Sequence, residues 1–527
     1  MTAKSYSRED LQTILANLRA TACDYLVLTY FRIHKIYSGP LYNKNKRRFN
    51  NIIIPDFPEI ARGLTTSVFL PKCFEVLWRE LAPRRYISAI HSKTRMGCTP
   101  IVIQFFDKSV GVQYRQLECQ CAPWQLATAL LDNGAIEKIV GYCGDYRFKD
   151  PGNVNDTSDY IVNLRILSGN DVLNLPTSDG FVEMLFRVLL DYLPDDVIQP
   201  LVMLGEVSLN SGNTSVVINQ LSATYAEWRA GQKNILLSSY VDYVTGNYTA
   251  INNYLKPLLC LPHSLTSLFS NVEYRFLLVF VKELYRKLAE YQLRDNNAVA
   301  YFFHLRELRD TFQKLHEGDL PLSEPWCYLN TEIEYLREHN QLTSEDDQRI
   351  QDLDNTVLDI IHMTYIRAVT YLDYLLRQFG NFDTHGWVLL TELPIKFDQV
   401  HGSYHQIKEA ACDKCRDLER EVQAVNCKIA RVPLMEVRGV ASKWVMILND
   451  SCFPLILELV EFLLALPASY DMAQTQDHED CVESTIRVNL EGVKDVEVVE
   501  RVEEFFEGYL GEARDIISKN QTPFLVE

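Results

Sequence analysis

The sequence predicts a mainly α-helical protein with a smaller, mixed α/β region at its N-terminus. Up to about residue 175, short stretches of alternating apolar and polar residues lie between helical segments, and beyond that point apolar residues recur at helical spacing. The most complete helical pattern lies far into the second part. We therefore expect three regions: 1–175, mixed and net basic; 176–467, a multi-helix domain; and 468–527, an acidic loop, a strand and a C-terminal helix.

The stretch from Thr343 to Gly380 has a start signal, a stop signal and one apolar stripe between them. Thr343 and Ser344 are favourable N-cap residues, and the acidic run after them suits the positive end of the helix dipole. Gly380 stands where a C-cap glycine belongs. The predicted helix, residues 345–379, is about 50 Å long. Its stripe consists of Leu353, Val357, Ile360, Ile361, Thr364, Ala368, Tyr371, Leu372, Leu375 and Phe379.

The mixed region begins with a predicted helix that Ser7 caps and that continues towards Ile33. A further helix is predicted over Pro71–Leu81, because proline is favoured at the first helical position. Two alternating runs, Ile101–Phe106 and Val110–Leu117, flank a short polar turn and indicate a β-hairpin. The segment Trp124–Leu131 has a helical pattern. A further strand is predicted over Tyr160–Leu167, where apolar and polar residues alternate again.

The helical domain is predicted from repeated three- and four-residue apolar spacings. The expected helices are Gly180–Leu193, Ser215–Arg229, Ile235–Tyr243, Asn271–Leu293, Ala298–His316, residues 345–379, Tyr404–Ile429 and Ser451–Leu466. The last region closes with an alternating strand at Thr485–Leu490 and an amphipathic helix at Val493–Ile517.

The overall composition is that of a globular protein: 527 residues, 47% hydrophobic and 23% charged. The 13 cysteines form no regular disulfide framework, which favours free thiols in a reducing compartment and a cytoplasmic location. No secretion signal begins the chain, and no apolar run reaches the ~18 residues of a membrane span. We therefore expect no membrane span.

The charge is unevenly distributed along the chain. Residues 1–110 contain 17 Lys and Arg against 8 Asp and Glu, a net charge of +9, which leaves −27 for the remainder of a chain whose total is −18. Aromatic residues are interleaved with the basic ones, so this region is a candidate nucleic-acid interface. The alternative is that the basic region docks on the acidic remainder of the chain. The candidate residues are Lys44, Lys46, Arg47, Arg48, Arg84, Arg85, Lys93 and Arg95.

A second candidate site combines His401, His405, Cys412 and Cys415, whose residue types suit zinc. Their spacing does not suit one ion if Tyr404–Ile429 is a single helix. His405 and Cys415 would then lie about 15 Å apart along the helix axis.

The sequence also contains two Asp-x-x-His pairs, Asp359–His362 and Asp398–His401. Helical di-iron proteins use a similar carboxylate–histidine spacing from two helices, although with glutamate. A haem ligand is the other role open to these histidines. The alternative function is therefore a helical oxygenase that depends on a metal or haem and uses His362, His401 or His405, with iron, zinc or haem as cofactor.

The sequence contains no nucleotide-binding or hydrolase fingerprint: no Walker A sequence, G-x-G-x-x-G, G-x-S-x-G, H-E-x-x-H or kinase H-R-D set. Amphipathic helices are abundant. We therefore expect a non-enzymatic interaction or assembly protein without a cofactor, such as a scaffold, a shell or a nucleoprotein-like subunit. Its partners would be other proteins or copies of itself as an oligomer, with nucleic acid as a candidate partner of the basic region.

Overall fold

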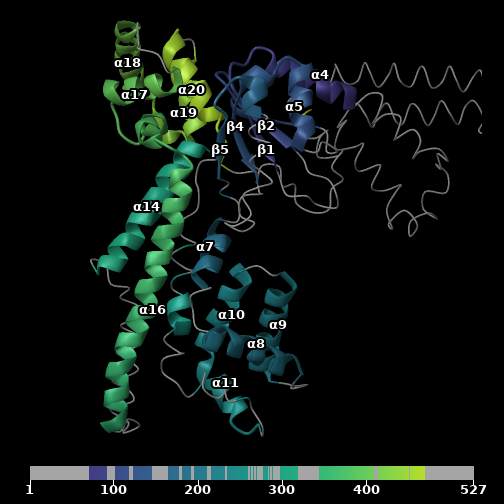
Figure 1. The fold of residues 1–527 in the computed structure, drawn as a ribbon, viewed down its shortest axis with the longest axis vertical. Helices are drawn as coiled ribbons and strands as arrows, with labels where there is room; N and C mark the ends of the chain where they lie inside the picture. The colour runs from purple at the N-terminus through teal and green to yellow at the C-terminus, as the bar shows by residue number, and fades with distance from the viewer. Residues whose placement is uncertain are drawn as a thin grey trace, which may run out of the picture. The chain divides into compact units, whose positions relative to one another are not determined.

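A computed structural model describes the fold (Figure 1). It describes residues 70–91, 101–117, 123–144, 164–176, 181–190, 195–210, 215–231, 234–258, 297–318, 344–408, 414–449 and 452–468, with isolated residues at 178, between 262 and 288, and at 489. Helices dominate these residues and the strands form one five-stranded sheet, so the predicted fold class is confirmed.

The chain divides into two compact units. Unit 1 comprises Met1–Leu173, Arg431–Val437 and Ala441–Glu527, and unit 2 comprises Asn174–Ala430 and Arg438–Val440. Unit 2 is therefore inserted in the chain between the parts of unit 1. The predicted regions 1–175, 176–467 and 468–527 stay predictions as domains.

Unit 1 contains a mixed sheet of strand order β3-β2-β1-β4-β5. The strands are β1 (Ile87–His91), β2 (Ile101–Asp107), β3 (Gly111–Gln116), β4 (Ile139–Gly144) and β5 (Leu173–Leu175), the last lying where the chain passes from unit 1 to unit 2. Strands β2 and β3 form the predicted hairpin, in which Asp107 pairs with Gly111. Strand β1 is antiparallel to β2 and parallel to β4. Sequence analysis missed β1, β4 and β5.

Helices cover both faces of this sheet, because alternate residues of the central strands are apolar on each side. The helices α4 (Leu70–Leu81) and α5 (Pro123–Asp132), both predicted, share one core with Ile87, Ile103 and Phe105. On the opposite side α20 (Pro454–Ala465), also predicted, packs against β1, β2 and β4 (Figure 1). There the Gln104 side chain donates from Nε2 to the Leu464 carbonyl at 3.1 Å.

The predicted strand over Tyr160–Leu167 is wrong where the structure describes it, because residues 164–168 are helical. Leu164 and Ser168 are buried while the three residues between them are exposed. Burial therefore repeats every four residues, as in a helix, and not every two.

Near the C-terminal end, Asn489 is described and is helical, whereas a strand was predicted over Thr485–Leu490. The predicted helix Val493–Ile517 lies outside the described residues, as does the predicted helix from Ser7 towards Ile33.

Apart from the last two residues of β5, the described elements of unit 2 are helices. Its elements are α7 (Phe181–Leu190), α8 (Asp195–Asn210), α9 (Val216–Gly231), α10 (Asn234–Gly246), α11 (Tyr248–Leu255), α14 (Ala298–Glu317), α16 (Ser344–Arg377), η4 (Phe382–Leu389), α17 (Phe397–Lys408) and α18 (Cys415–Ile429). Of these, α7, α9, α10 and α14 correspond to predicted helices. Sequence analysis missed α8, which contains Pro200, because an internal proline normally ends a helical pattern.

The long helix α16 confirms the predicted helix over residues 345–379, and it packs along α14 (Figure 1). Gly380, with φ of 63°, adopts the left-handed conformation expected just after the helix. An ion pair between Arg309 Nε and Asp373 Oδ1, 3.0 Å apart, links the two helices. The buried members of the predicted stripe are Ile361, Thr364, Ala368, Leu372, Leu375 and Phe379.

The predicted helix Tyr404–Ile429 is wrong as a single helix, because the structure has two, α17 and α18. Both bury one stripe, and Val400 in α17 and Leu418 in α18 are buried at equivalent positions. These residues are 18 positions apart, which is about five whole helical turns. The buried residues of α17 and α18 therefore recur at the spacing of one continuous helix, so the sequence pattern gives no sign of the break. None of the described helices is long and apolar enough to cross a membrane.

Candidate functional site

Of the eight predicted nucleic-acid-binding residues, the structure describes Arg84 and Arg85, which follow α4 and precede β1. The other six, Lys44, Lys46, Arg47, Arg48, Lys93 and Arg95, lie outside the described residues.

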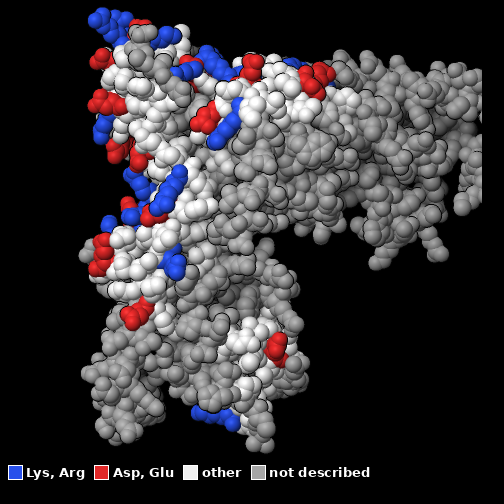
Figure 2. Space-filling view, viewed as in Figure 1, with Lys and Arg blue, Asp and Glu red and all other residues white. Residues whose placement is uncertain are grey.

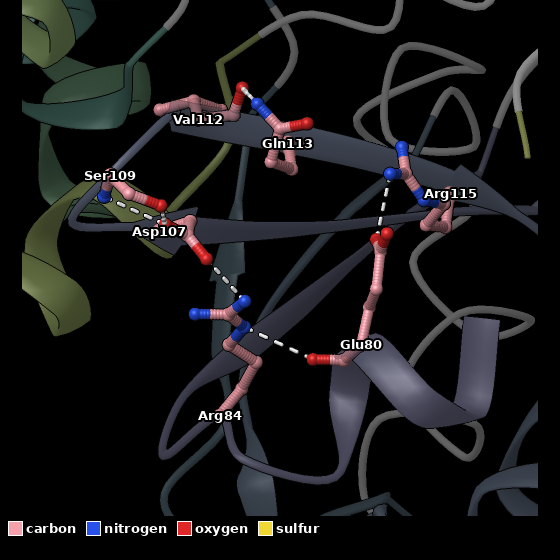
Figure 3. A network of polar contacts seen from close by, with 7 residues as sticks. All are labelled: Glu80, Arg84, Asp107, Ser109, Val112, Gln113 and Arg115. Atoms are coloured by element: carbon pink, nitrogen blue, oxygen red, sulfur yellow. Dashed lines mark hydrogen bonds and ion pairs between the residues drawn. The ribbon is translucent and has the colours of Figure 1, made fainter. Parts of the chain in front are cut away.

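Arg84 is held by groups of unit 1 on several sides. Its Nε donates a hydrogen bond to the Glu80 carbonyl oxygen at 3.0 Å, and its Nη2 forms an ion pair with Asp107 Oδ2 (Figure 3). The guanidinium carbon lies 5.1 Å from the centre of the Phe105 ring. Arg84 therefore has a structural role, because it connects the end of α4 to strand β2.

Glu80 joins this network to a second arginine, Arg115 on β3 (Figure 3). The Glu80 carboxylate lies 2.7 Å from Arg115 Nη2, while Arg115 Nη1 donates to the Tyr114 carbonyl at 2.6 Å. Only 8% of the Arg115 side chain is exposed, whereas the Glu80 side chain keeps 28% of its surface exposed, so the arginine is the buried member of the pair. Sequence analysis did not single out Arg115, because its position on a strand gives no sign of a buried charge.

Asp107 receives hydrogen bonds from both the backbone and the side chain of Ser109, in addition to the ion pair with Arg84. Burial by itself would raise the pKa of Asp107, but the hydrogen bonds from Ser109 and the Arg84 charge outweigh it, so the pKa is lowered. The carboxylate is therefore ionised at neutral pH and compensates the charge of Arg84.

Arg85 faces two carboxylates of α20. Its guanidinium lies 3.9 Å from Glu458 Oε2 and 3.8 Å from Glu461 Oε2, and the Tyr86 hydroxyl donates to Glu458 Oε1 at 3.1 Å. Burial raises the pKa of Glu461, and the nearby Arg85 and Arg84 charges oppose that rise. About half of the Arg85 side chain, 49%, stays exposed.

Both described arginines thus have carboxylate partners within unit 1. Arg85 shows the arrangement expected if basic residues near the N-terminus pair with acidic residues later in the chain, whereas Asp107, the partner of Arg84, belongs to the region 1–110 itself. On the face drawn in Figure 2, lysine and arginine side chains of the described residues are interspersed with aspartate and glutamate. Nucleic-acid binding by the whole predicted set stays a prediction.

The histidine and cysteine candidates are divided between two places in unit 2. His362 on α16 is exposed and lies beside His316 on α14, with ring centres 5.4 Å apart. The break between α17 and α18 brings His401 Nε2 to 3.4 Å from Cys415 Sγ. The His405 ring lies one turn further along α17, 6.4 Å from the His401 ring.

The separation of about 15 Å between His405 and Cys415, expected along one continuous helix, therefore does not apply. Cys412 lies outside the described residues. Within the described part of the chain, no three or more His, Cys, Asp and Glu side chains are arranged to hold a metal ion.

A buried serine–histidine contact that sequence analysis missed lies between η4 and α17. Ser403 Oγ is 2.8 Å from His385 Nδ1, 2.8 Å from Trp387 Nε1 and 2.8 Å from the Thr384 carbonyl oxygen. The indole N–H is only a donor and the carbonyl is only an acceptor. The serine proton therefore goes to Thr384, and Ser403 Oγ accepts hydrogen bonds from Trp387 and His385.

This assignment fixes the neutral histidine with its proton on Nδ1, so His385 does not take a proton from Ser403. Burial lowers the pKa of His385 to about 4, which keeps the ring neutral at physiological pH. Ser403 and His385 resemble a catalytic pair in residue type, but the serine proton is donated to Thr384 and not to the histidine. The contact therefore has a structural role: it is a clamp that holds η4 against α17. Nothing in the sequence around Ser403 on α17 or His385 in η4 indicates that the two side chains meet.

Comparisons with models of known protein families, with curated proteins and with solved structures find no match to this chain.

Proposed function

We propose that this chain is a non-enzymatic interaction or assembly protein that associates with a second copy of itself through the exposed face of α16. The observation that carries this proposal is a row of apolar side chains on that face. Met363, Ile366 and Tyr374 are 45%, 37% and 45% exposed. Met363 and Ile366 lie about one turn apart, and exposed Thr370 separates them from Tyr374 on the same face. Exposed apolar residues gathered on one side of a helix are typical of protein contacts, and methionine and tyrosine are enriched in interfaces.

The three residues share one side of the helix. At about 100° per residue, Ile366 lies about 60° and Tyr374 about 20° around the helix from Met363. The buried residues Ala368 and Leu372 lie about 140° and 180° away from Met363 on the same scale. The exposed row is therefore opposite the stripe that packs inside unit 2.

The charges at the two ends of this row favour a second copy as the partner. Asp359 and Arg377 are both exposed and lie on the same side as Ile366. A two-fold axis beside residue 368 would place Asp359 of one copy opposite Arg377 of the other, twice, with the apolar row between them. A surface that carries opposite charges at equal distances from its centre is self-complementary, as a two-fold dimer requires.

The experiment that tests the proposal is light scattering after size exclusion across a range of protein concentrations. We expect a dimer whose dissociation constant rises at least tenfold in Met363→Ser/Ile366→Ser/Tyr374→Ser, because the variant removes the apolar contact. Met435→Ser, at a position that is 97% exposed, is the matched control and leaves the dimer unchanged. A strict monomer at every concentration would refute the proposal.

Charge reversal tests the antiparallel geometry independently. Asp359→Arg and Arg377→Asp, made singly, each place like charges opposite each other and weaken the dimer. The double variant Asp359→Arg/Arg377→Asp restores opposite charges and recovers the association. A double variant that is as weak as the two singles would exclude this pairing of helices.

A reducing, cytoplasmic environment belongs to this proposal. The described cysteines Cys73, Cys143, Cys415, Cys427 and Cys452 are all free thiols, which supports it.

The alternative from the sequence, an oxygenase that depends on a metal or haem and uses His362, His401 or His405, stays a prediction. Metal analysis and an absorption spectrum of the purified protein test it. Stoichiometric iron or zinc, or a haem band, would favour the alternative over assembly.

A further inference from the structure

The meeting point of α17 and α18 brings together a thiol and an imidazole from different helices (Figure 1). Cys415 Sγ lies 3.4 Å from His401 Nε2, a distance at which a thiol can hydrogen-bond to a ring nitrogen. The Phe397 ring lies 5.5 Å from the His401 ring, centre to centre, and limits the positions that the imidazole can take. The Cys415 residue is partly exposed, so a small reagent can reach it.

Cys415 is also the first residue of α18, a helix of 15 residues. His401 lies across the break on α17, and its Nε2 atom is placed to take the thiol proton when the sulfur attacks an electrophile.

From this geometry we propose that Cys415 is a nucleophilic thiol activated by His401, and that it is a site of covalent modification by small electrophiles. With iodoacetamide as the probe, the Cys415 proton passes to His401 Nε2 and then to solvent. The sulfur forms a bond to the carbon of the reagent, the carbon–iodine bond breaks, and iodide leaves with the electron pair. No redox partner is needed for this step.

The experiment measures alkylation rates of individual cysteines in the full chain by quenching and peptide mass spectrometry at pH 7. Cys427 and Cys452 are exposed free thiols in the same molecule and serve as internal references. We expect Cys415 to react about tenfold faster than Cys427, in spite of its lower exposure, because a positioned base accelerates proton removal. An equal or slower reaction at Cys415 would refute the proposal.

Two histidine variants separate the role of His401 from a general effect of the surroundings. His401→Gln keeps a side chain of similar length that can accept a hydrogen bond but removes the base, and we expect the Cys415 rate to fall about tenfold. His405→Gln removes the neighbouring imidazole, and we expect the Cys415 rate to stay within twofold of the original. Unchanged reactivity in His401→Gln would refute the role of His401.

A metal on the pair is the remaining outcome to distinguish. The rates are therefore measured with and without prior treatment with a chelator, with metal analysis of both samples. Fast alkylation in both samples supports the proposal. Alkylation that appears only after a stoichiometric metal is removed would assign the pair to metal binding and overturn it. Circular dichroism of each variant confirms that the rates refer to folded protein.

Discussion

Asn489 binds the main chain of Gln116 through both polar atoms of its side chain. Its Oδ1 accepts a hydrogen bond from the Gln116 N–H at 2.6 Å, and its Nδ2 donates to the Gln116 carbonyl at 2.7 Å. Both residues are fully buried. Gln116 ends strand β3, which lies at the edge of the sheet among the described strands, and a residue 373 positions later binds its backbone N–H and carbonyl groups.

We predict that Asn489→Ala lowers the free energy of unfolding by about 2–4 kcal/mol, because it leaves one buried N–H and one buried carbonyl without this partner. Asn133→Ala is the matched control, since Asn133 is exposed and its hydrogen bond to the Ala129 carbonyl is also exposed. The control should change stability by less than about 0.5 kcal/mol. Urea denaturation of both variants provides the measurement, and equal effects would contradict the role of Asn489.

Gly205 on α8 packs against the ring of Tyr225 on α9. A Cβ added at this residue would overlap the ring of Tyr225, whereas a Cβ at Gly246 in α10 meets no atom within 4 Å. We predict that Gly205→Ala lowers stability by about 1–3 kcal/mol through overpacking. Gly246→Ala should leave stability unchanged or raise it by up to about 1 kcal/mol. Thermal unfolding of the two alanine variants distinguishes close packing from a general effect of replacing glycine.

The Ser403 hydroxyl oxygen accepts hydrogen bonds from two buried ring N–H groups, those of His385 and Trp387. We predict that Ser403→Ala lowers stability by about 2–4 kcal/mol, because the ring N–H groups of His385 and Trp387 both lose their acceptor. The emission of Trp387 should also change. Ser442→Ala, at an exposed position in α19 (Val440–Leu448), serves as the control and should have little effect. Denaturation followed by fluorescence measures both variants, and a stable Ser403→Ala protein would argue against the clamp.

His385 should make stability depend on pH. Burial lowers its pKa to about 4 in the folded state, whereas an unfolded histidine titrates near 6.5. Below pH 6.5 the unfolded chain therefore binds a proton that the folded chain does not, and stability falls until about pH 4. Relative to His385→Gln, the original protein should lose about 2 kcal/mol between pH 7.5 and 5.

His405→Gln is the control for this pH dependence, because it removes an exposed histidine. Urea midpoints at both pH values measure the difference. A constant difference between the original protein and His385→Gln would contradict the assignment.

The basic N-terminal residues are tested by a salt titration with labelled RNA. If Lys44, Lys46, Arg47 and Arg48 bind phosphates, affinity should fall as salt rises, because binding releases counterions. Replacing all four with serine should lower affinity without lowering the melting temperature, since exposed charges contribute little to stability. RNA binding that is absent or independent of salt would remove the nucleic-acid prediction.

Helices and strands whose ends are marked by nearby capping or turn residues could be predicted from the sequence. The turn around Asp107 bounds the hairpin, and Asn297 and Gly318 bound α14, where the Asn297 side chain accepts from two backbone N–H groups. Each of these signals lies within a few residues of the element that it limits. Short strands such as β1 carry no comparable local signal, because their stability comes from neighbouring strands.

The candidate contacts could not be predicted, because each depends on the relation between two elements. The pair of His401 and Cys415 exists only because the chain breaks between α17 and α18, and the 18-residue spacing of Val400 and Leu418 conceals that break. The partners of Arg84 and Arg85 are likewise set by the packing of α20 and the hairpin against the end of α4.

The helix that covers the second face of the sheet is made late in protein synthesis. Gln104 on β2 and Leu464 on α20 are 360 residues apart, and the whole of unit 2 is translated between them. At about 5–20 residues per second, α20 follows β2 after roughly 20–70 s. During that time the face of β1, β2 and β4 that packs against α20 in the folded chain, where Gln104 meets Leu464, has not yet met that helix. This face of the sheet can therefore complete its packing only after the whole of unit 2 has been synthesised.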